Sequence, residues 1–479
     1  MNNRISPELD QLFETLIGSE KRIIYDKIGQ SLPHTIRFNP LKGAISELQD
    51  LLKEQGFIFS VFEGFENIFR INYQPYPIGK SLSHYLGHIY VQDVASMLPP
   101  LVLDPQPGEW ILDMSAAPGS KTTQIAALMQ NKGVLIANDI VMKRIRALAA
   151  NLERFGVVNA AIFKLFGEQY GSQYFEVFDR VLLDPACSGL GTLHKSPEVL
   201  NWWTPRHCER MATGQKSMIA SAIKALKPGG ILCYSTCTLT PEENEEVIDY
   251  ALREFPIELE SIFVSGLKLR PGLTKYNGRV YNPTLEKACR VYPTENDTEG
   301  FFITRVRKTG SMKLSGSQNN GKKIRLPFLP SSKSPVKKYL DYLSQLFQIP
   351  RKMFSEYIYV MTGNIIFNGK ELNDFPFYHK PVQGGLAAGR QMREGAKLTT
   401  GGVHLLGDYA RENVIQLSRL EELEKFVNRE PMDIKLNEKG QVIVKYKNCN
   451  VGYGLAIDGI LKSQFPKGEW PFKLVQENR

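Results

Sequence analysis

The spacing of apolar residues changes twice along this chain of 479 residues and divides it into three parts. The first part, residues 1–90, has helical periodicity through residues 6–28, an extended segment at 34–42, and a second helical stretch that stops at Gly56. From Glu109 onward, short apolar runs alternate with helical segments. This alternation predicts an α/β domain built on a parallel, doubly wound sheet.

The last third of the chain has a different pattern. Helical periodicity at residues 336–347 and 351–358 is followed by short apolar runs with Gly-rich turns. The pair Asp458-Gly459 stands between two such runs and is typical of a β-hairpin. We therefore expect helices first and then an antiparallel β structure in this part.

Basic residues concentrate where the second part meets the third. From Arg305 to Lys338 there are ten Lys or Arg and no Asp or Glu. A solvated linker explains this composition, and so does a contact of Lys322, Lys323 and Arg325 with a nucleic-acid backbone. The whole chain has 59 Lys+Arg against 50 Asp+Glu, and this net charge of +9 favours a polyanionic partner without requiring one.

Composition excludes several classes of protein. Six cysteines without a CxxC pair are too few for a disulfide scaffold, and they do not form a zinc ribbon or a thioredoxin-like site. The chain has no uninterrupted apolar run of about 18 residues, and its N-terminal sequence MNNRISPELDQLFETL lacks the apolar core of a signal peptide. We expect a cytoplasmic, soluble protein with no membrane or metal partner.

The segment WILDMSAAPGSKTTQIAALM, residues 110–129, predicts a strand, a tight loop and a helix. Its small loop residues let the backbone approach a ligand closely, and the helix N-terminus directs unpaired N–H groups toward that ligand. The patterns GxGxxG and GxxxxGK[ST] are absent, which argues against a pyrophosphate-binding loop. The predicted cofactor-binding residues of this loop are Ser115, Ala116, Ala117, Pro118, Gly119, Ser120 and Lys121.

A carboxylate supports this interpretation of the loop. Asp139 comes at the end of the next predicted strand, 26 residues after Asp113, where it can accept hydrogen bonds from both ribose hydroxyls. S-adenosylmethionine satisfies these requirements, because it has a ribose, an adenine and an amino-acid tail but no phosphate. The alternative, a purely structural turn, is weakened by the position of Asp139.

Two cysteines follow neighbouring strands of the predicted sheet. Cys187 comes just after the fourth strand, and Cys237 lies at the end of the fifth. Because strands consecutive in sequence usually lie side by side and their carboxyl ends form the ligand crevice, both sulfurs should face one site. A cysteine at a strand end is usually a small buried hydrophobe, but two at adjacent strand ends are harder to explain in that way.

The sequence after Cys237 predicts a helix start, with Thr240 as the cap, Pro241 in the first turn and Glu243 at the third position. A helix N-terminus favours a thiolate, whereas the glutamates nearby oppose it. Cys233 and Cys237 would be about 13 Å apart on one strand, too far to share a metal ion. Thr240 also stands where a radical iron–sulfur cluster would need its third cysteine.

A thiolate beside S-adenosylmethionine suits one methyl acceptor in particular. Carbon 5 of a pyrimidine becomes nucleophilic only after a thiolate has added to carbon 6, whereas most acceptors need no such help. Asp184 could stabilise nitrogen 3 of the ring if its pKa is raised, and the second cysteine could assist the elimination that follows.

The chain resembles the Nol–Nop–Sun family of RNA cytosine-5 methyltransferases, most closely the bacterial branch that modifies small-subunit (16S) ribosomal RNA. The resemblance lies in TIRFNPLK, GHIYVQDVASMLPP, DMSAAPGSKT, LLDPACSG, YSTCTLTPEEN and EGFFITRVRK. It implies that Cys237 is the nucleophile, that Cys187 assists product release, and that Asp184 lies between cofactor and base. Lys121 would orient the methyl acceptor or Asp184. The alternative for Lys121 is a surface position or a helix-capping role. S-adenosylmethionine would be held by the loop residues, Asp139 and Asp184.

The chain departs from the family pattern at two positions. The family usually has Pro directly before the release cysteine, but Pro185 stands one place early, so the direction of the Cys187 side chain is harder to predict. The family commonly has an Asp after the third strand to bind the adenine amino group. The matching residue is Phe166, with Glu168 as the candidate substitute, and we expect weaker cofactor binding.

The resemblance also implies a domain organisation. A small N-terminal α+β RNA-binding domain at 1–90 precedes a Rossmann-like methyltransferase domain at 91–308 and a basic linker at 309–335. A C-terminal RNA-binding extension at 336–479 ends in a PUA-like β-barrel from about residue 395. We expect a monomer that acts on RNA, either free or within a small-subunit particle, and that flips its target base out of the stack.

Several alternatives remain open from the sequence. Transfer RNA is an alternative substrate, and a catalytically vestigial RNA-binding factor of ribosome assembly is an alternative function. Trp202 and Trp203 could stack on a base or pack a helix. Gln92 and Asp93 could shape the site or contribute only to helix packing.

Overall fold

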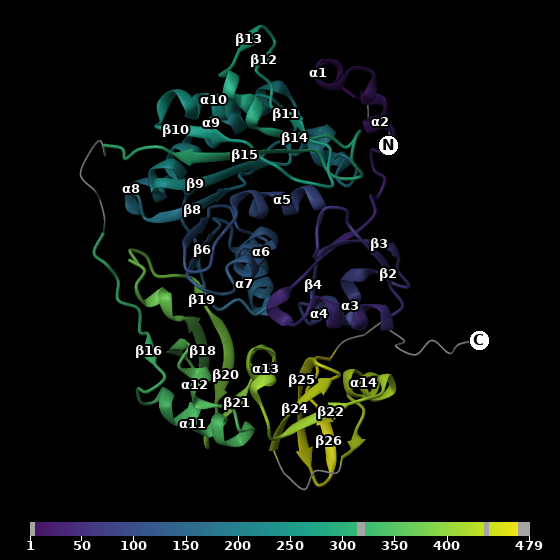
Figure 1. Cartoon of the computed structure of the whole chain (residues 1–479), viewed down its shortest axis with the longest axis vertical. Coiled ribbons are helices and arrows are strands. Elements are labelled where there is room, and N and C mark those ends of the chain that lie inside the picture. Colours follow the sequence, from purple (N-terminus) through teal and green to yellow (C-terminus); the bar gives the residue numbers. More distant parts are fainter. Residues whose placement is uncertain (1–4, 314–320, 435–439, 468–479) are drawn as a thin grey trace.

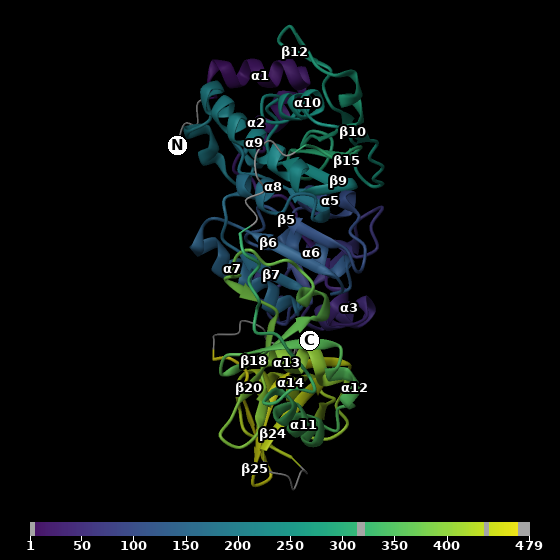
Figure 2. The same ribbon diagram turned by 90° about the vertical axis from the view of Figure 1, so that its left-hand side faces the viewer.

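The computed structural model describes residues 5–313, 321–434 and 440–467. Parts of the predicted linker and of the predicted C-terminal barrel lie outside these ranges. Figure 1 shows a large central domain, with the N-terminal sheet beside it and the C-terminal part below both. Figure 2, turned by 90°, shows the C-terminal part extending from one end of the central domain.

A mixed sheet, with ten strands among the described residues, forms the central domain. Its parallel strands have the order β9-β8-β5-β6-β7, which confirms the predicted doubly wound arrangement. Strand residues alternate between two apolar cores, one on each face of the sheet. The bounds are β5 (Trp110–Asp113), β6 (Val134–Asn138), β7 (Ala160–Phe163), β8 (Phe178–Leu183) and β9 (Leu226–Thr236).

Helices cover both faces of this sheet (Figure 1). One face is covered by α5 (Val94–Leu103), α6 (Ser120–Leu128) and α7 (Met142–Phe155). The other face is covered by α8 (Tyr170–Gln173), α9 (Pro205–Ala225) and α10 (Glu245–Glu254). Among the described residues, no helix combines the length and apolar character needed to cross a bilayer.

The prediction of an entirely parallel sheet was wrong at its edges. The motif EGFFITRVRK contains the last strand of this domain, β15 (Phe301–Lys308), which runs antiparallel to β9. The chain between α10 and β15 contains short strands rather than one crossover helix, so it returns in the opposite direction. These strands are β10 (Ile257–Glu260), β11 (Arg270–Pro271), β12 (Lys275–Tyr276), β13 (Arg279–Val280) and β14 (Cys289–Val291).

The N-terminal residues form two units rather than one. The helical stretch predicted over 6–28 is interrupted at Gly18, whose φ of 56° ends the first helix. The resulting α1 (Pro7–Ile17) and α2 (Lys21–Asp26) pack on the central domain with Trp203 in their shared core. Trp203 therefore serves packing, whereas Trp202 is 47% exposed.

The second N-terminal unit is a sheet with the order β2-β3-β1-β4, covered by two helices. Strand β4 leads directly into α5, so this sheet lies next to the central domain. Its elements are β1 (Thr35–Phe38), α3 (Ile45–Glu54), β2 (Ile58–Val61), β3 (Ile68–Tyr73), α4 (Leu82–Tyr85) and β4 (Ile89–Val91).

The C-terminal part begins with a helix-and-sheet unit. The predicted helix at 336–347 is present, whereas the one predicted at 351–358 ends at Phe354 because the β-favouring residues after it form a strand. The elements are β16 (Leu329–Pro330), α11 (Val336–Phe347), α12 (Arg351–Phe354), β17 (Tyr357–Met361), β18 (Asn364–Gly369), β19 (Gln383–Gly384), β20 (Leu386–Gln391), β21 (Ala396–Leu398) and α13 (Thr400–Leu406).

The final unit is a sheet with the order β22-β24-β25-β26-β23. The predicted hairpin is confirmed, because Asp458 and Gly459 join β25 to β26 with φ values of 50° and 78°. The elements are β22 (Val414–Leu417), α14 (Leu420–Val427), β23 (Met432–Asp433), β24 (Gly440–Tyr446), β25 (Cys449–Ile457) and β26 (Ile460–Ser463).

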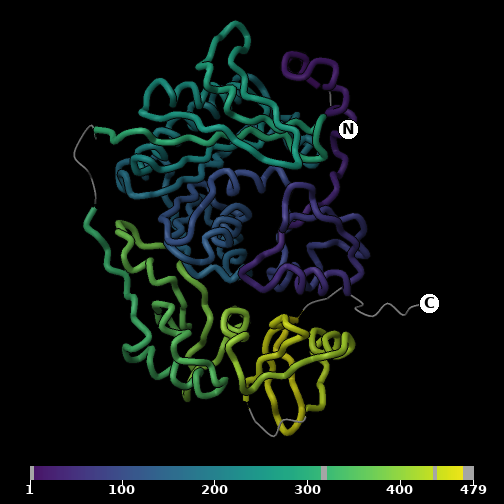
Figure 3. The backbone as a smooth tube through the Cα atoms, in the orientation of Figure 1, coloured from purple at the N-terminus to yellow at the C-terminus, as the bar shows by residue number. Residues whose placement is uncertain are grey.

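The C-terminal part packs back against the rest of the chain. Strand β19 extends the central sheet by pairing with β7, and the final sheet shares an apolar core with the N-terminal sheet. Polar contacts reinforce the second interface: Asn448 Nδ2 donates to Glu47 at 2.6 Å, and the Tyr446 hydroxyl donates to Glu54 at 3.1 Å. The tube in Figure 3 shows the purple N-terminal segment beside the yellow final domain.

The described part of the basic linker is not wholly solvated. Leu326 and Phe328 pack against the core of the central domain, whereas Lys322, Lys323 and Arg325 are exposed. The apolar residues therefore anchor the segment and leave its charges facing solvent.

Candidate active site

The cofactor loop has the predicted strand–loop–helix geometry. Asp113 ends β5, and α6 begins at Ser120. Gly119 has φ 107°, and a Cβ there would lie 3.0 Å from Leu148 Cδ1, so a larger residue would be strained. The Thr122 hydroxyl donates to Asp113 at 2.7 Å, and burial raises the pKa of Asp113 to about 7.

Asp139 lies beside this loop, as expected. It follows β6 directly and is only 3% exposed. The Val141 N–H donates to Asp139 Oδ1 at 2.9 Å, and Arg144 lies 3.2 Å from Oδ2. Because Arg144 also donates to the Ala117 carbonyl at 2.6 Å, one guanidinium joins the carboxylate to the cofactor loop.

The structure brings the two cysteines together. Cys187 Sγ and Cys237 Sγ are 3.1 Å apart, and both residues are partly exposed. The early position of Pro185 therefore does not turn Cys187 away from the site. The hydrogen bond to Cys237, together with burial, raises the pKa of Cys187 well above its ordinary value. The two sulfurs therefore share one hydrogen bond, in which either thiol can donate.

The predicted helix start after Cys237 was wrong. Helix α10 begins at Glu245, eight residues after Cys237, and its N-cap residue Asn244 makes no side-chain capping bond. A four-residue turn separates Thr240 from the helix. The helix N-terminus therefore does not account for thiolate formation at Cys237.

Glu243 does not act as the helix-capping residue that the sequence predicted. Its buried carboxylate accepts from the Ser188 N–H at 2.9 Å, from Gln215 Nε2 at 3.0 Å and from the Thr240 hydroxyl at 2.7 Å. A buried carboxylate needs several donors, and the loop after Cys187 supplies one of them. Glu243 therefore ties the two cysteine loops together.

Lys121 and Asp184 form an ion pair next to the thiols. Lys121 Nζ lies 2.7 Å from Asp184 Oδ2 and donates to Ser96 Oγ at 3.1 Å. The Ser235 hydroxyl donates to Asp184 Oδ1 at 2.8 Å. Burial opposes the Lys121 charge, but Asp184 and, more weakly, Cys237 raise its pKa above the ordinary value. The alternative surface role for Lys121 is therefore wrong, since its side chain is only 12% exposed.

Gln92 and Asp93 differ in their relation to this ion pair. Asp93 caps α5 by accepting from the Ala95 N–H at 2.9 Å, and its other oxygen accepts from the Glu299 N–H at 3.2 Å. Gln92 Nε2 instead donates to the carbonyl of Ser96 at 2.9 Å. Gln92 therefore reaches Lys121 through one intervening residue, while Asp93 has a packing role.

Sequence reasoning missed Ser96 and Ser235. Ser235 lies near the end of β9, two positions before Cys237, which directly follows the strand. The alternation of side chains along the predicted strand could have identified Ser235. Ser96 lies in the first turn of α5 and carried no comparable signal. Phe166 and Glu168 are both exposed after β7, Phe166 to 63%. The part of the chain that the structure describes contains no cluster of three His, Cys, Asp or Glu residues suited to a metal ion.

Comparison with known proteins agrees with this geometry. Residues 100–307 match the family described as 16S rRNA methyltransferase RsmB/F, and residues 412–469 match the methyltransferase RsmF PUA domain. The ribosomal RNA small subunit methyltransferase F of Vibrio parahaemolyticus is 33% identical over 453 residues, which are 91% of each chain. This chain belongs to the RsmB/F family of RNA methyltransferases.

Other relatives of this RsmB/F methyltransferase match a little under two thirds of it. The tRNA (cytosine(49)-C(5))-methyltransferase of Pyrococcus abyssi is 40% identical over 310 residues, 64% of this chain and 97% of that one. A crystal structure of a methyltransferase homolog from Pyrococcus horikoshii has 37% identity and a TM-score of 0.57, covering 63% of this chain and 94% of that one. NSun6 from Pyrococcus horikoshii, solved with SFG, has 25% identity and a TM-score of 0.56, covering 64% and 99%.

These matches establish the class of the protein and its fold. The central domain is a Rossmann-like methyltransferase domain, the final sheet belongs to a PUA domain, and the protein is an RNA methyltransferase.

Proposed function

We propose that this RsmB/F methyltransferase transfers the methyl group of S-adenosylmethionine to carbon 5 of a cytosine in small-subunit ribosomal RNA, through a covalent bond between Cys237 and the base. The proposal is carried by one observation: two sulfurs lie 3.1 Å apart, beside the ion pair of Lys121 and Asp184. Transfer RNA is the second candidate substrate, because a relative 40% identical is named a transfer RNA cytosine-5 methyltransferase.

The residues present fit S-adenosylmethionine. Asp139 offers a carboxylate at the end of β6, and the Ser115–Gly119 loop leads into α6, whose first N–H groups have no partner within the helix. NSun6, a relative of the same fold, was solved with SFG, an analogue of this cofactor. When bound, S-adenosylmethionine supplies an electrophilic methyl group on a sulfonium sulfur.

Cys237 is assigned as the nucleophile that adds to carbon 6 of the cytosine. Its sulfur shares a hydrogen bond with the Cys187 thiol, and the Lys121 ammonium lies near enough to interact with it electrostatically. The thiolate is the form of cysteine that attacks carbon. Addition makes carbon 5 nucleophilic, and carbon 5 then takes up the methyl group.

Asp184 is assigned to position the base and Lys121. One of its oxygens accepts from Lys121 and the other from Ser235, so Asp184 acts as an acceptor in this arrangement. An acceptor suits the exocyclic amino group of cytosine. When Cys237 adds to carbon 6, negative charge develops in the ring. The ammonium group of Lys121 supplies the positive charge that stabilises it.

Cys187 is assigned to the elimination that follows. The adduct must lose its carbon-5 proton, after which the bond between Cys237 Sγ and carbon 6 breaks. Cys187 Sγ lies 3.1 Å from Cys237 Sγ, so it lies beside the adduct that Cys237 forms. As a thiolate, after giving its proton to solvent, Cys187 accepts the carbon-5 proton at the step where a base is needed.

The flanking parts are assigned to RNA binding. The PUA domain packs on the N-terminal sheet, and exposed Lys322, Lys323 and Arg325 follow the methyltransferase domain. Positive side chains on such surfaces hold the phosphate backbone independently of sequence, and this leaves the chemistry to the central domain.

Bisulfite sequencing of total RNA from cells with and without this protein tests the substrate. We expect one protected cytosine in small-subunit ribosomal RNA to become convertible when the protein is absent. If a cytosine in transfer RNA loses its protection instead, transfer RNA is the substrate. If every cytosine keeps its protection, cytosine-5 methylation by this protein is contradicted.

Replacing Asp139 with Asn should weaken S-adenosylmethionine binding about 10- to 100-fold. A hydrogen bond to a charged group contributes about 1.5–3 kcal/mol, and the neutral amide can accept only one such bond well. Isothermal titration calorimetry gives the dissociation constant. The control is Asp50→Asn on an exposed position of α3, which should bind as the wild type does. Equal affinities for all three proteins would remove Asp139 from the cofactor site.

A further inference from the structure

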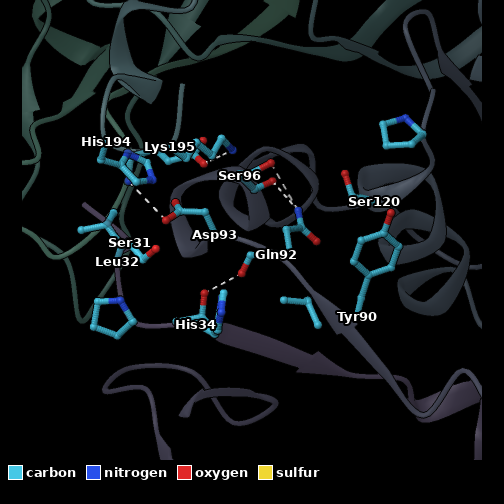
Figure 4. A pocket seen from close by; sticks show the side chains of 15 residues that line it. Ser31, Leu32, His34, Tyr90, Gln92, Asp93, Ser96, Ser120, His194 and Lys195 are labelled. Atoms are coloured by element: carbon cyan, nitrogen blue, oxygen red, sulfur yellow. Dashed lines mark hydrogen bonds and ion pairs between the residues drawn. The ribbon is translucent and has the colours of Figure 1, made fainter. Parts of the chain in front are cut away.

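A cavity of about 480 Å³ lies at the seam between the N-terminal sheet and the methyltransferase domain (Figure 4). Five segments wall it, at residues 31–35, 90–96, 118–120, 194–195 and 299. The N-terminal sheet contributes Tyr90 and Gln92, the cofactor loop and α6 contribute Pro118 and Ser120, and the loop that follows Cys187 contributes Lys195. The cavity shares Pro118 and Ser120 with the proposed cofactor site, but it extends beyond them to residues that have no assigned role.

The cavity adjoins the proposed reactive centre without including it. Ser120 immediately precedes Lys121, and Ser96, another wall residue, accepts a hydrogen bond from Lys121 Nζ at 3.1 Å. On the other side, the Gly191 N–H donates to the Cys237 carbonyl at 2.9 Å, within the loop that ends at the cavity. A ligand in the cavity would therefore sit next to a base held at the thiols.

The walls combine groups that recognise a nucleotide. Tyr90 offers an aromatic ring, and His34 is exposed at the rim, where it can meet phosphate. Lys195 is also exposed, and it is paired with Glu299, another wall residue. Gln92 is 7% exposed, and its Oε1 has no hydrogen-bond partner among the residues that the structure describes. This oxygen is a buried acceptor without a donor, as expected of a residue that binds a ligand group.

We propose that this cavity binds an unpaired nucleotide of the RNA substrate adjacent to the target cytosine, with Gln92 accepting from the edge of its base. The inference rests on the proposed function. A target base that is flipped out leaves its neighbour unstacked, and single-stranded RNA is read by stacking and by hydrogen bonds to base edges. The N-terminal sheet thereby takes part in selecting the methylated site.

Filling the cavity tests the proposal. The variant Ser31→Trp places an indole at a small residue that lines the cavity and has no assigned catalytic or cofactor-binding role. The KM for small-subunit ribosomal RNA should rise at least about tenfold, while the dissociation constant of S-adenosylmethionine should stay unchanged. Gln30→Trp adds the same bulk at the neighbouring exposed position outside the cavity, and it should behave as the wild type. Equal KM values for the two variants would overturn the proposal.

A second measurement does not depend on a loss of activity. His34, at the rim, is replaced by the photoreactive residue p-benzoylphenylalanine, and the irradiated complex with a small-subunit RNA transcript is mapped by reverse-transcription stops. We expect a stop within about three nucleotides of the methylated cytosine, because a flipped base and its neighbour stay covalently joined. Methylation without any nearby stop would refute the subsite. A crosslink to RNA that is never methylated would support the subsite and contradict the proposed function.

Discussion

Replacing Cys237 with Ser should lower the rate of methyl transfer to RNA by about 10⁴-fold or more. A hydroxyl is far less ionised than a thiol at neutral pH, so the serine oxygen cannot add to carbon 6 at a useful rate. The Cys187 thiol and the Lys121 ammonium beside this position are not bases, so they cannot remove the proton of the serine hydroxyl. Transfer of tritiated methyl groups to a small-subunit RNA transcript measures the rate.

Two controls make this result specific. Cys449→Ser, on β25 of the PUA domain, introduces the same chemical change far from the thiols and should keep wild-type activity. The dissociation constant of S-adenosylmethionine should be the same for Cys237→Ser and the wild type. If Cys237→Ser retains more than about a tenth of the wild-type rate, covalent catalysis through this residue is excluded.

Replacing Cys187 with Ala should trap the protein on its substrate. The nucleophile is intact in this variant, so the adduct forms and receives its methyl group. The sulfur 3.1 Å from Cys237 that would take the carbon-5 proton is missing, so the adduct should persist. A protein–RNA species that survives denaturing electrophoresis should accumulate, and multiple-turnover rates should fall about 10²- to 10⁴-fold, the usual contribution of a general base.

The double variant Cys187→Ala/Cys237→Ala is the matched control for this trap. It should form no denaturant-resistant species, since the bond requires Cys237. Omitting S-adenosylmethionine should also reduce the trapped species, because the adduct reverses readily before methyl transfer. If Cys187→Ala turns over at the wild-type rate without any adduct, the elimination must use another base.

Local sequence was sufficient for the parts of the site that depend on one strand and the loop after it. The segment from Trp110 to Leu128 forms a strand, a tight loop and a helix because its apolar spacing and its glycine act within a few residues. The convergence of Cys187 and Cys237 also followed from sequence, since adjacent parallel strands bring their carboxyl ends to one edge.

Contacts between distant segments decided the rest. The motif after Cys237 suggested a helix start, but Glu243 lies before α10 and accepts from Ser188 as well as from Thr240. A buried carboxylate is satisfied by the donors that the fold brings near it. Ser96 reaches Lys121 only because α5 packs beside α6. No local pattern encodes such a contact.

The sequence by itself determined the doubly wound core, the cofactor loop, the two cysteines and the family, because each is encoded within short motifs or a repeating spacing. Only the tertiary structure decided the antiparallel edge of the sheet, the ion pair of Lys121 and Asp184, and the cavity beside them. These features join residues far apart in the chain. Their geometry depends on how separate units pack together. The spacing of residues within one segment does not predict that packing.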